Sequence, residues 1–325
     1  MKLIIQIPCL NEEQTLPLTI ADLPKSVHGI DKIEILIIDD GSTDRTVEVA
    51  QELKVDHIVR NVGTLGLARS FRKGLDACLA HGADIIVNTD GDNQYVGQDI
   101  AKLVQPIVEG KADIVIGDRR TSEIEHFSPL KKILQKLGSR VVRQLSGTQV
   151  PDAVSGFRAL SRNAALRMNI ISPYSYTVEM LIQAGKKKIA IAHVPIRTNP
   201  NTRESRLFTS IPTFIGRQLS SMLRMYSMFE PLRVFATIGL LIFTLGIFPV
   251  IRFLWYYFSG EGQGHIQSLI IGGVLMNLGF LTLMIGLLAD LISFNRKLIE
   301  ITLEKIRKIE LGQIKKEIKE QNRAS

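Results

Sequence analysis

The chain has 325 residues, of which 45% are hydrophobic and 22% charged, and its 40 Lys and Arg against 32 Asp and Glu give a formal net charge of +8. This composition excludes a disordered, collagen-like or low-complexity protein. Two cysteines are too few for a disulfide framework and indicate a reducing compartment. The positive charge suits a nucleic acid, a membrane surface or a phosphorylated substrate as partner.

Short apolar runs alternate with helical stretches over the first 120 residues. The apolar runs are 3–7, 34–38, 57–60, 84–88 and 113–116, and the helical stretches are 12–23, 44–53, 67–81 and 97–109. This alternation predicts an α/β fold of Rossmann-like type, with a parallel sheet and helices on both of its faces. In such sheets ligands bind beyond the carboxyl ends of the strands.

Acidic residues follow two of these predicted strands. Asp39 and Asp40 end one run, and Asp90 and Asp92 follow another. Acids at neighbouring strand ends repel one another unless a cation or a hydrogen-bond donor lies among them. Mg²⁺ prefers one or two carboxylates together with substrate phosphate oxygens, and Gln94 adds a neutral oxygen. The pattern therefore predicts a site for a divalent cation and a diphosphate; the alternative is a solvated turn, since Asp-Gly pairs are common in turns.

The second part of the chain holds two uncharged apolar segments, 234–251 and 266–289. Each is long enough to cross a bilayer as a helix. The loop 259–267 between them lacks Lys and Arg, whereas the outer flanks are basic, so both termini are expected in the cytosol. The first apolar run is too short for a signal peptide, so the N-terminal part is expected to stay there too.

These features predict a multi-pass protein of the inner (cytoplasmic) membrane with four parts. The expected parts are a cytosolic catalytic domain 1–206, amphipathic juxtamembrane helices 207–231, two transmembrane helices 232–294 and a basic cytosolic tail 295–325. Glycines recur every seven residues in both apolar segments, at Gly239, Gly246, Gly272, Gly279 and Gly286. This spacing predicts close helix packing, within the hairpin or between subunits of a homo-oligomer; the alternative is that glycine is frequent in membrane helices.

Five motifs occur in an order that resembles a known family. They are Ile-Pro-Cys-Leu-Asn-Glu-Glu at 7–13, Ile-Asp-Asp-Gly-Ser-Thr-Asp at 38–44, Asn-Val-Gly at 61–63 with Gly-Leu at 66–67, Asp-Gly-Asp-Asn-Gln at 90–94, and Asp152 with Ser-Gly-Phe-Arg at 155–158. Together they resemble the family-two glycosyltransferases. The closer resemblance, over about 1–206, is to the polyprenyl-phosphate sugar transferase type, which includes dolichyl-phosphate mannose synthases and bacterial polyprenyl-phosphate glucosyltransferases.

The resemblance implies one nucleotide-sugar-binding domain of the glycosyltransferase A type, an inverting mechanism and a Mg²⁺ or Mn²⁺ cofactor. Matched by motif, the nucleotide-binding residues are Pro8, Leu10, Glu12, Asp40, Asp90 and Arg203. The metal ligands are Asp92 and Gln94, the acceptor-phosphate residues are Arg119 and Lys132, and the catalytic residues are Asp90, Asp92 and Asp152. Leu10 stands where many members have an aromatic residue, and Lys132 where Arg is commoner.

The expected reaction is transfer of one sugar from a nucleotide-diphosphate sugar to a polyprenyl phosphate at the cytosolic membrane face. UDP-glucose is the preferred donor because of the membrane architecture, and undecaprenyl phosphate the preferred acceptor. Three alternatives stay open, namely a mannose synthase that uses GDP-mannose, another lipid acceptor, and a membrane-anchored sugar-nucleotide sensor without activity. Nucleic-acid binding is not expected, because no basic stretch is interleaved with aromatic residues.

Overall fold

The computed structural model describes residues 1–120, 142–143, 146–171, 176–200, 216, 220, 224, 226–260 and 262–324. The chain divides into two compact units. One comprises Met1–Met222 with Leu303–Ser325, and the other comprises Leu223–Thr302. The predicted juxtamembrane segment 207–231 lies largely outside the described residues.

The first unit is built on a seven-stranded sheet in the order β3-β2-β1-β4-β6-β5-β7. Its strands are β1 (Lys2–Cys9), β2 (Lys32–Asp39), β3 (His57–Arg60), β4 (Ile85–Asn88), β5 (Ile114–Asp118), β6 (Arg158–Ser161) and β7 (Ile191–Pro195). All five predicted strands are present, and the predicted α/β fold is confirmed. The five predicted strands run parallel to one another, as predicted, but the sheet as a whole is mixed, because β6 lies between β4 and β5 and runs antiparallel to both.

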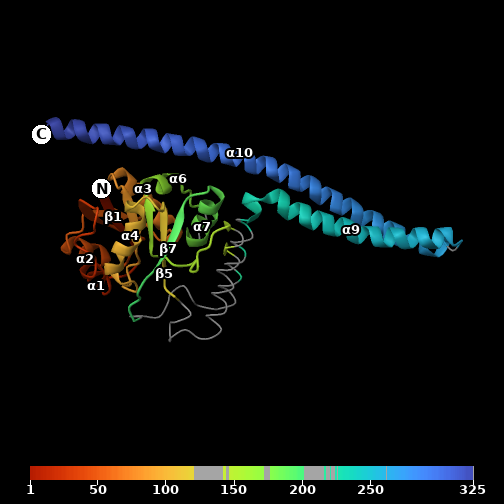
Figure 1. Cartoon of the computed structure of the whole chain (residues 1–325), viewed down its shortest axis with the longest axis horizontal. Coiled ribbons are helices and arrows are strands. Elements are labelled where there is room, and N and C mark those ends of the chain that lie inside the picture. Colours follow the sequence, from red (N-terminus) through yellow and green to blue (C-terminus); the bar gives the residue numbers. More distant parts are fainter. Residues whose placement is uncertain are drawn as a thin grey trace. The chain divides into compact units, whose positions relative to one another are not determined.

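Helices cover both faces of the sheet, as predicted. One face carries α1 (Leu16–Ala21), α2 (Thr46–Glu52) and α4 (Ile100–Val108), which pack on alternate side chains of β1, and the short 3₁₀ turn η1 (Gly97–Asp99) precedes α4. The opposite face carries α3 (Leu67–Ala80), α6 (Arg162–Arg167) and α7 (Tyr176–Lys186). Figure 1 shows α3 and α6 on the other side of the strands from α1 and α4.

Two of these helices begin later than the sequence predicts. The predicted starts at 12 and 44 lie before α1 and α2, which begin at Leu16 and Thr46. The reason is that the intervening side chains bind neighbouring backbone instead of extending the helices. Asp44 accepts a hydrogen bond from the Thr46 amide at 3.0 Å and another from the Glu13 amide at 3.2 Å.

Strand direction brings the polar segments to one edge of the sheet. The parallel strands β1, β2, β4 and β5 all end there, and the antiparallel strand β6 begins there. In the register, Cys9 pairs with Asp39 and Asn88 pairs with Arg158. The loops that follow β1, β2, β4 and β5, and the loop that precedes β6, therefore share this edge.

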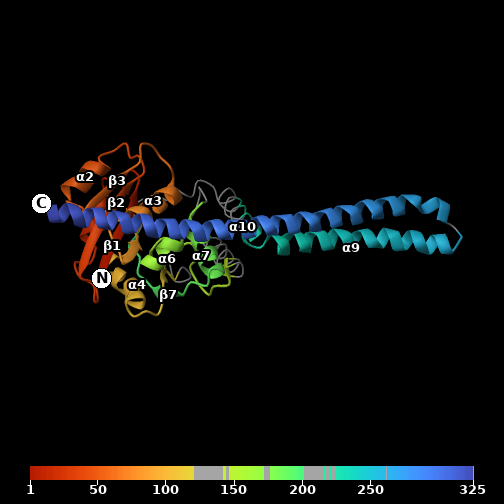
Figure 2. The same ribbon diagram turned by 90° about the horizontal axis from the view of Figure 1, so that it is seen from above.

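The second unit contains two long apolar helices, α9 (Pro231–Phe258) and the first part of α10 (Ile266–Ala324), joined through the 3₁₀ turn η2 (Gly262–His265). Both are long and apolar enough to cross a membrane. They lie side by side in two perpendicular views (Figures 1 and 2). Helix α10 continues without interruption through residue 294, where the sequence predicted the end of the second transmembrane helix.

The predicted packing of the glycine faces is confirmed within the hairpin. A Cβ atom added to Gly279 would lie 2.7 Å from the Gly239 carbonyl oxygen, and one added to Gly246 would lie 2.9 Å from the Gly272 carbonyl oxygen. A Cβ on Gly286 would meet the Phe235 side chain at 2.8 Å. The two backbones therefore approach more closely than any larger side chain permits.

Candidate functional site

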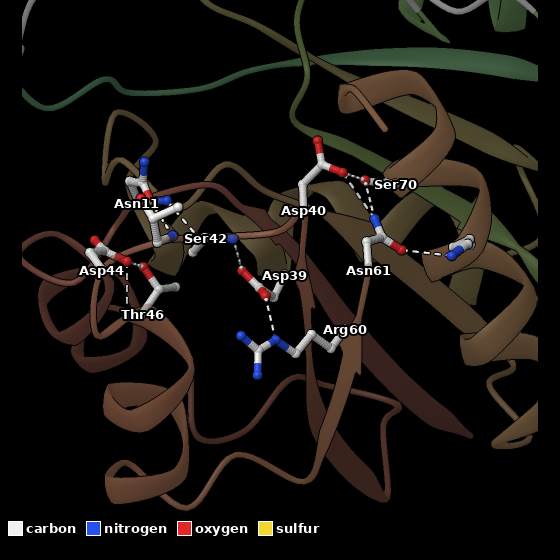
Figure 3. A network of polar contacts seen from close by, with 11 residues as sticks. Asn11, Asp39, Asp40, Ser42, Asp44, Thr46, Arg60, Asn61 and Ser70 are labelled. Carbon is white, nitrogen blue, oxygen red and sulfur yellow. Dashed lines mark hydrogen bonds and ion pairs between the residues drawn. The ribbon is translucent and has the colours of Figure 1, made fainter. Parts of the chain in front are cut away.

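The loops after β1 and β2 are locked together by hydrogen bonds (Figure 3). The Asn11 amide donates to Ser42 Oγ at 2.9 Å, and the Thr43 amide donates to Asn11 Oδ1 at 2.8 Å. The Ser42 amide in turn donates to Asp39 Oδ1 at 2.9 Å. Asn11 has a positive φ of 55°, a conformation that asparagine tolerates better than most residues. The edge beside β1 and β2 is therefore a fixed surface.

Asp40 holds the next loop to this surface (Figure 3). Its Oδ1 accepts hydrogen bonds from Asn61 Nδ2 at 2.9 Å, from Ser70 Oγ at 2.8 Å and from the Leu65 amide at 2.9 Å. Its Oδ2 accepts one from the Gly66 amide at 2.9 Å. Since both carboxylate oxygens are bonded to protein donors, Asp40 positions the segment 61–66 as well as lining the predicted nucleotide site.

Four of the residues predicted to bind the nucleotide come together here. Pro8 lies near the end of β1, Leu10 and Glu12 follow it, and Asp40 follows the adjacent strand β2. The Asp40 amide donates to the Cys9 carbonyl at 2.9 Å, which joins the two strand ends directly.

The loop that follows β4 carries Asp90, Asp92 and Gln94 against the end of β1. A Cβ atom on Gly91 would lie 3.0 Å from Cys9 Sγ and 3.3 Å from Glu12 Cγ, so this part of the loop lies in contact with the β1 segment. Within the loop, Asp92 Oδ1 accepts a hydrogen bond from the Gln94 amide at 3.1 Å. The structure thus brings the predicted metal ligands next to the predicted nucleotide residues.

Gly156 joins the segment before β6 to the same loop. A Cβ atom at this position would lie 3.1 and 3.2 Å from the two carboxylate oxygens of Asp90 and 3.1 Å from the Tyr176 hydroxyl. The Gly156 amide donates to the Tyr95 hydroxyl at 3.1 Å, and burial raises the pKa of Tyr95 to about 12, so the phenol is neutral at physiological pH. The Asp90 carboxylate therefore occupies space that only a glycine leaves open.

Arg119 and Asp152 form a bidentate ion pair beside this loop. Arg119 Nε lies 2.7 Å from Asp152 Oδ2, and Arg119 Nη2 lies 3.0 Å from Asp152 Oδ1. The side chains are 16% and 2% exposed. Burial lowers the pKa of Arg119, but the nearby Tyr95, Asp152 and Asp90 together raise it by more. The pKa of Arg119 therefore lies above its ordinary value. Arg119 is thus a permanent cation beside Asp90.

Arg158 supports the segment that carries Asp152, a role that sequence reasoning missed. Its buried guanidinium donates to the carbonyls of Ala153 at 2.8 Å, Ser155 at 2.7 Å and Thr177 at 2.7 Å. Burial lowers the pKa of Arg158 to about 10, so it stays charged at neutral pH. The signal available in the sequence was the Ser-Gly-Phe-Arg motif itself, but motif spacing does not reveal that its arginine points inward.

Comparison with known proteins identifies this arrangement. Residues 4–167, about half of the chain, match the glycosyl transferase family 2. The chain belongs to glycosyl transferase family 2.

Two curated relatives carry a dolichyl phosphate or a polyprenol in their names. The chain is 32% identical over 216 residues to the UDP-N-acetylglucosamine–dolichyl-phosphate N-acetylglucosaminyltransferase of Methanococcus voltae, which covers 59% of this chain and 83% of that one. It is 25% identical over 204 residues to the polyprenol monophosphomannose synthase of Mycolicibacterium smegmatis, with 59% and 76% covered. The predicted resemblance to the polyprenyl-phosphate type and the assignment as a glycosyltransferase are confirmed.

A solved structure shares the fold. The glucosyl-3-phosphoglycerate synthase of Mycobacterium tuberculosis, crystallised with Mn²⁺, UDP and phosphoglyceric acid, matches with a TM-score of 0.55 over 69% of this chain and 78% of that one. The identity is 20%, so the likeness concerns the glycosyltransferase A type fold alone.

The donor atoms of this glycosyltransferase fit a divalent cation that is also bound by substrate. Asp90, Asp92 and Gln94 supply carboxylate and amide oxygens, the ligands that Mg²⁺ and Mn²⁺ prefer. Within the part of the chain that the structure describes, no group of three or more His, Cys, Asp or Glu side chains could hold a metal alone. Diphosphate oxygens would have to complete the shell, because Asp39 and Asp40 bind protein donors instead.

Two predicted site residues lie outside the described residues. They are Lys132, predicted to bind the acceptor phosphate, and Arg203, predicted to bind the nucleotide.

Proposed function

We propose that this glycosyltransferase transfers one sugar, with inversion, from a nucleotide-diphosphate sugar to a polyprenyl phosphate at the cytosolic face of the membrane. One observation carries the proposal. The acidic loop with Asp90 and Asp92 and the cationic Arg119 lie at one edge of the sheet, joined through Gly156 and Tyr95. A site for a donor diphosphate thus adjoins a positive charge suited to an acceptor phosphate.

The chemistry needs placement and charge more than proton transfer. A phosphate monoester is anionic near neutral pH, so its oxygen can attack without a strong general base. The new bond joins that oxygen to the anomeric carbon, and the bond from this carbon to the nucleoside diphosphate breaks, with the electron pair leaving on the diphosphate. Arg119 would hold the attacking phosphate in line, and Asp152 fixes the orientation of Arg119 through two hydrogen bonds.

A divalent cation would complete the donor side of the site. Asp92 and Gln94 would hold it, and Asp90 would contact the nucleotide or the sugar. When bound, Mg²⁺ or Mn²⁺ supplies charge that stabilises the departing diphosphate. Support comes from the fold relative that was crystallised with Mn²⁺ and UDP.

The apolar hairpin would keep the enzyme at the membrane that contains its acceptor. Helices α9 and α10 are long and apolar enough to span it, and the basic flanks favour cytosolic termini and a cytosolic catalytic domain. The polyprenyl-phosphate acceptor is supported by the two curated relatives, whose names specify a dolichyl phosphate and a polyprenol.

The donor is the finer part of the proposal. UDP-glucose remains the first choice on membrane architecture, but GDP-mannose is supported as strongly, because one relative is named as a monophosphomannose synthase. UDP-N-acetylglucosamine is a third candidate, since it is named in the other relative.

A donor and acceptor panel tests the proposed function. Full-length protein in detergent would receive Mn²⁺, one of the three donors, and either undecaprenyl phosphate or diacylglycerol, with the lipid products read by mass spectrometry. We expect a sugar phospholipid from undecaprenyl phosphate with one donor, and activity about 100-fold lower in Asp92→Ala. Glu48→Ala, an exposed acid on α2 paired with Arg45, is the matched control and should retain activity.

Two results would contradict this proposal. Failure of every donor to yield a lipid product, despite nucleotide-sugar binding, would favour a sensor. A product formed only with diacylglycerol would show that the acceptor is a diacylglycerol and not a polyprenyl phosphate.

A further inference from the structure

The segment after β7 pairs with the acidic loop as a short antiparallel ladder. Tyr95 and Thr198 form an isolated antiparallel bridge, and the Val96 amide donates to the Arg197 carbonyl at 3.4 Å. The two segments are about a hundred positions apart in the chain. The loop that carries the predicted cation ligands is therefore supported by residues that lie outside every motif of the sequence.

Asn199 extends this ladder to the cation ligands themselves. Its amide donates to the Gln94 carbonyl at 2.8 Å, and its side-chain Nδ2 donates to the Asn93 carbonyl at 3.0 Å. Asn93 has a positive φ of 56°, and it lies between Asp92 and Gln94. The Asn199 side chain thus stabilises an unfavourable backbone conformation between the two predicted ligands.

Arg197 fixes the start of the same segment. Its amide donates to Asp99 Oδ2 at 2.7 Å, and its Nη2 lies 2.7 Å from Asp99 Oδ1. Asp99 is fully buried and also pairs with Lys102 at 2.9 Å. Arg197 is thus anchored on a buried carboxylate outside the acidic loop, and this anchor helps to place Asn199 two residues later.

We propose that Asn199 is a positioning residue that sets the affinity of the loop with Asp92 and Gln94 for a divalent cation. The inference rests on the proposed function, since it assumes that these two residues hold the cation. Groups that orient metal ligands typically change metal affinity about 10- to 100-fold when they are removed. Asn199 would orient the ligands through the backbone, because its side chain and its amide hold the carbonyls of Asn93 and Gln94.

Direct Mn²⁺ binding to the full-length protein tests the proposal without turnover. The free Mn²⁺ signal in electron paramagnetic resonance gives the dissociation constant in the presence of UDP. We expect Asn199→Ala to weaken Mn²⁺ binding about 10- to 100-fold. Asn199→Leu, which has a similar size but lacks the donor, should behave alike. Thr198→Ala is the matched control, because Thr198 contributes its backbone to the bridge and its side chain is exposed.

Hydrogen exchange on metal-free protein supplies a second readout. We expect faster exchange in Asn199→Ala for the loop amides of Gln94 and Val96, with the strand amides of β1 unchanged. Wild-type Mn²⁺ affinity and wild-type loop exchange in Asn199→Ala would overturn the inference. A wild-type protein that binds no Mn²⁺, or binds it as well after Asp92→Ala, would instead overturn the metal assignment of the proposed function, and this inference with it.

Discussion

Arg119 and Asp152 are 33 positions apart, yet they meet through two parallel N–H···O hydrogen bonds of 2.7 and 3.0 Å. The pair exists because Arg119 follows β5 while Asp152 precedes the antiparallel strand β6 that pairs with it. The two hydrogen bonds keep the plane of the Arg119 guanidinium fixed. A lysine could not form both of them, because its ammonium group lacks the planar, two-pronged geometry of a guanidinium.

Asp152→Asn should destabilise the protein and weaken acceptor binding. The change leaves a nearly buried guanidinium without its carboxylate, which typically costs about 3–5 kcal/mol of unfolding free energy. We expect a higher KM for the lipid phosphate, measured by product formation, and a lower urea midpoint. Donor KM should change little, and Arg119→Lys should show the same pattern. An unchanged KM for the acceptor in both variants would show that the Arg119–Asp152 pair plays no part in acceptor binding.

Gly156→Ala should impair both activity and stability. The added Cβ would meet both Asp90 carboxylate oxygens and the Tyr176 hydroxyl at 3.1–3.2 Å, so Asp90 must move. Overpacking of this size typically costs about 1–3 kcal/mol. We expect kcat/KM for the donor to fall at temperatures where the variant is still fully folded, and the thermal midpoint to fall by about 2–4 °C for each kcal/mol of this cost. Gly110→Ala is a stability control with open space around it, although its φ of 68° adds backbone strain. A wild-type kcat/KM for the donor in Gly156→Ala would show that activity does not depend on the present position of Asp90.

Acid should destabilise the first unit through Glu34, at the opposite edge of the sheet. Burial raises the pKa of Glu34, but hydrogen bonds from Lys2, Lys32 and His57 outweigh it and lower the pKa from 4.5 to about 2. Because the folded-state pKa is depressed, the stabilisation is complete above pH 4.5 and is lost as the pH falls toward 2. The free-energy difference between wild type and Glu34→Gln should therefore shrink between pH 6 and pH 3.

Urea unfolding of both proteins at several pH values measures this difference. A difference that stays constant down to pH 3 would show that Lys2, Lys32 and His57 do not stabilise the Glu34 carboxylate.

Gly279→Val should separate the two apolar helices. Its Cβ would lie 2.6 Å from the Phe243 amide nitrogen and 2.7 Å from the Gly239 carbonyl oxygen, both of which are backbone atoms. We expect a lower thermal midpoint in detergent, by an amount that corresponds to about 1–3 kcal/mol. Gly273→Val, on the same helix but with open space around it, is the matched control. Equal midpoints for the two variants would contradict the observed packing.

The sequence predicted best where a strand end coincides with a polar motif. The positions of Asp40, Asp90 and Asp92 followed from parallel strands, because their carboxyl ends must share an edge. The reversal at β6 was not predictable, since Arg158–Ser161 has four residues and no marked alternation. Without that reversal, neither the Arg119–Asp152 pair nor the contact of Gly156 with Asp90 could be inferred. The role of Asn199 also depends on tertiary pairing that no local pattern records.

The order of strands has a consequence for synthesis of the protein. Strand β6 lies between β4 and β5 although it follows both in the chain, so nothing occupies that gap until Ser161 has left the ribosome. A nascent chain that ends earlier exposes the unpaired edges of two apolar strands, and such edges invite aggregation. The sheet of the catalytic unit is therefore complete only when its last strand, β7, has emerged, which happens before the first apolar helix, α9, is synthesised.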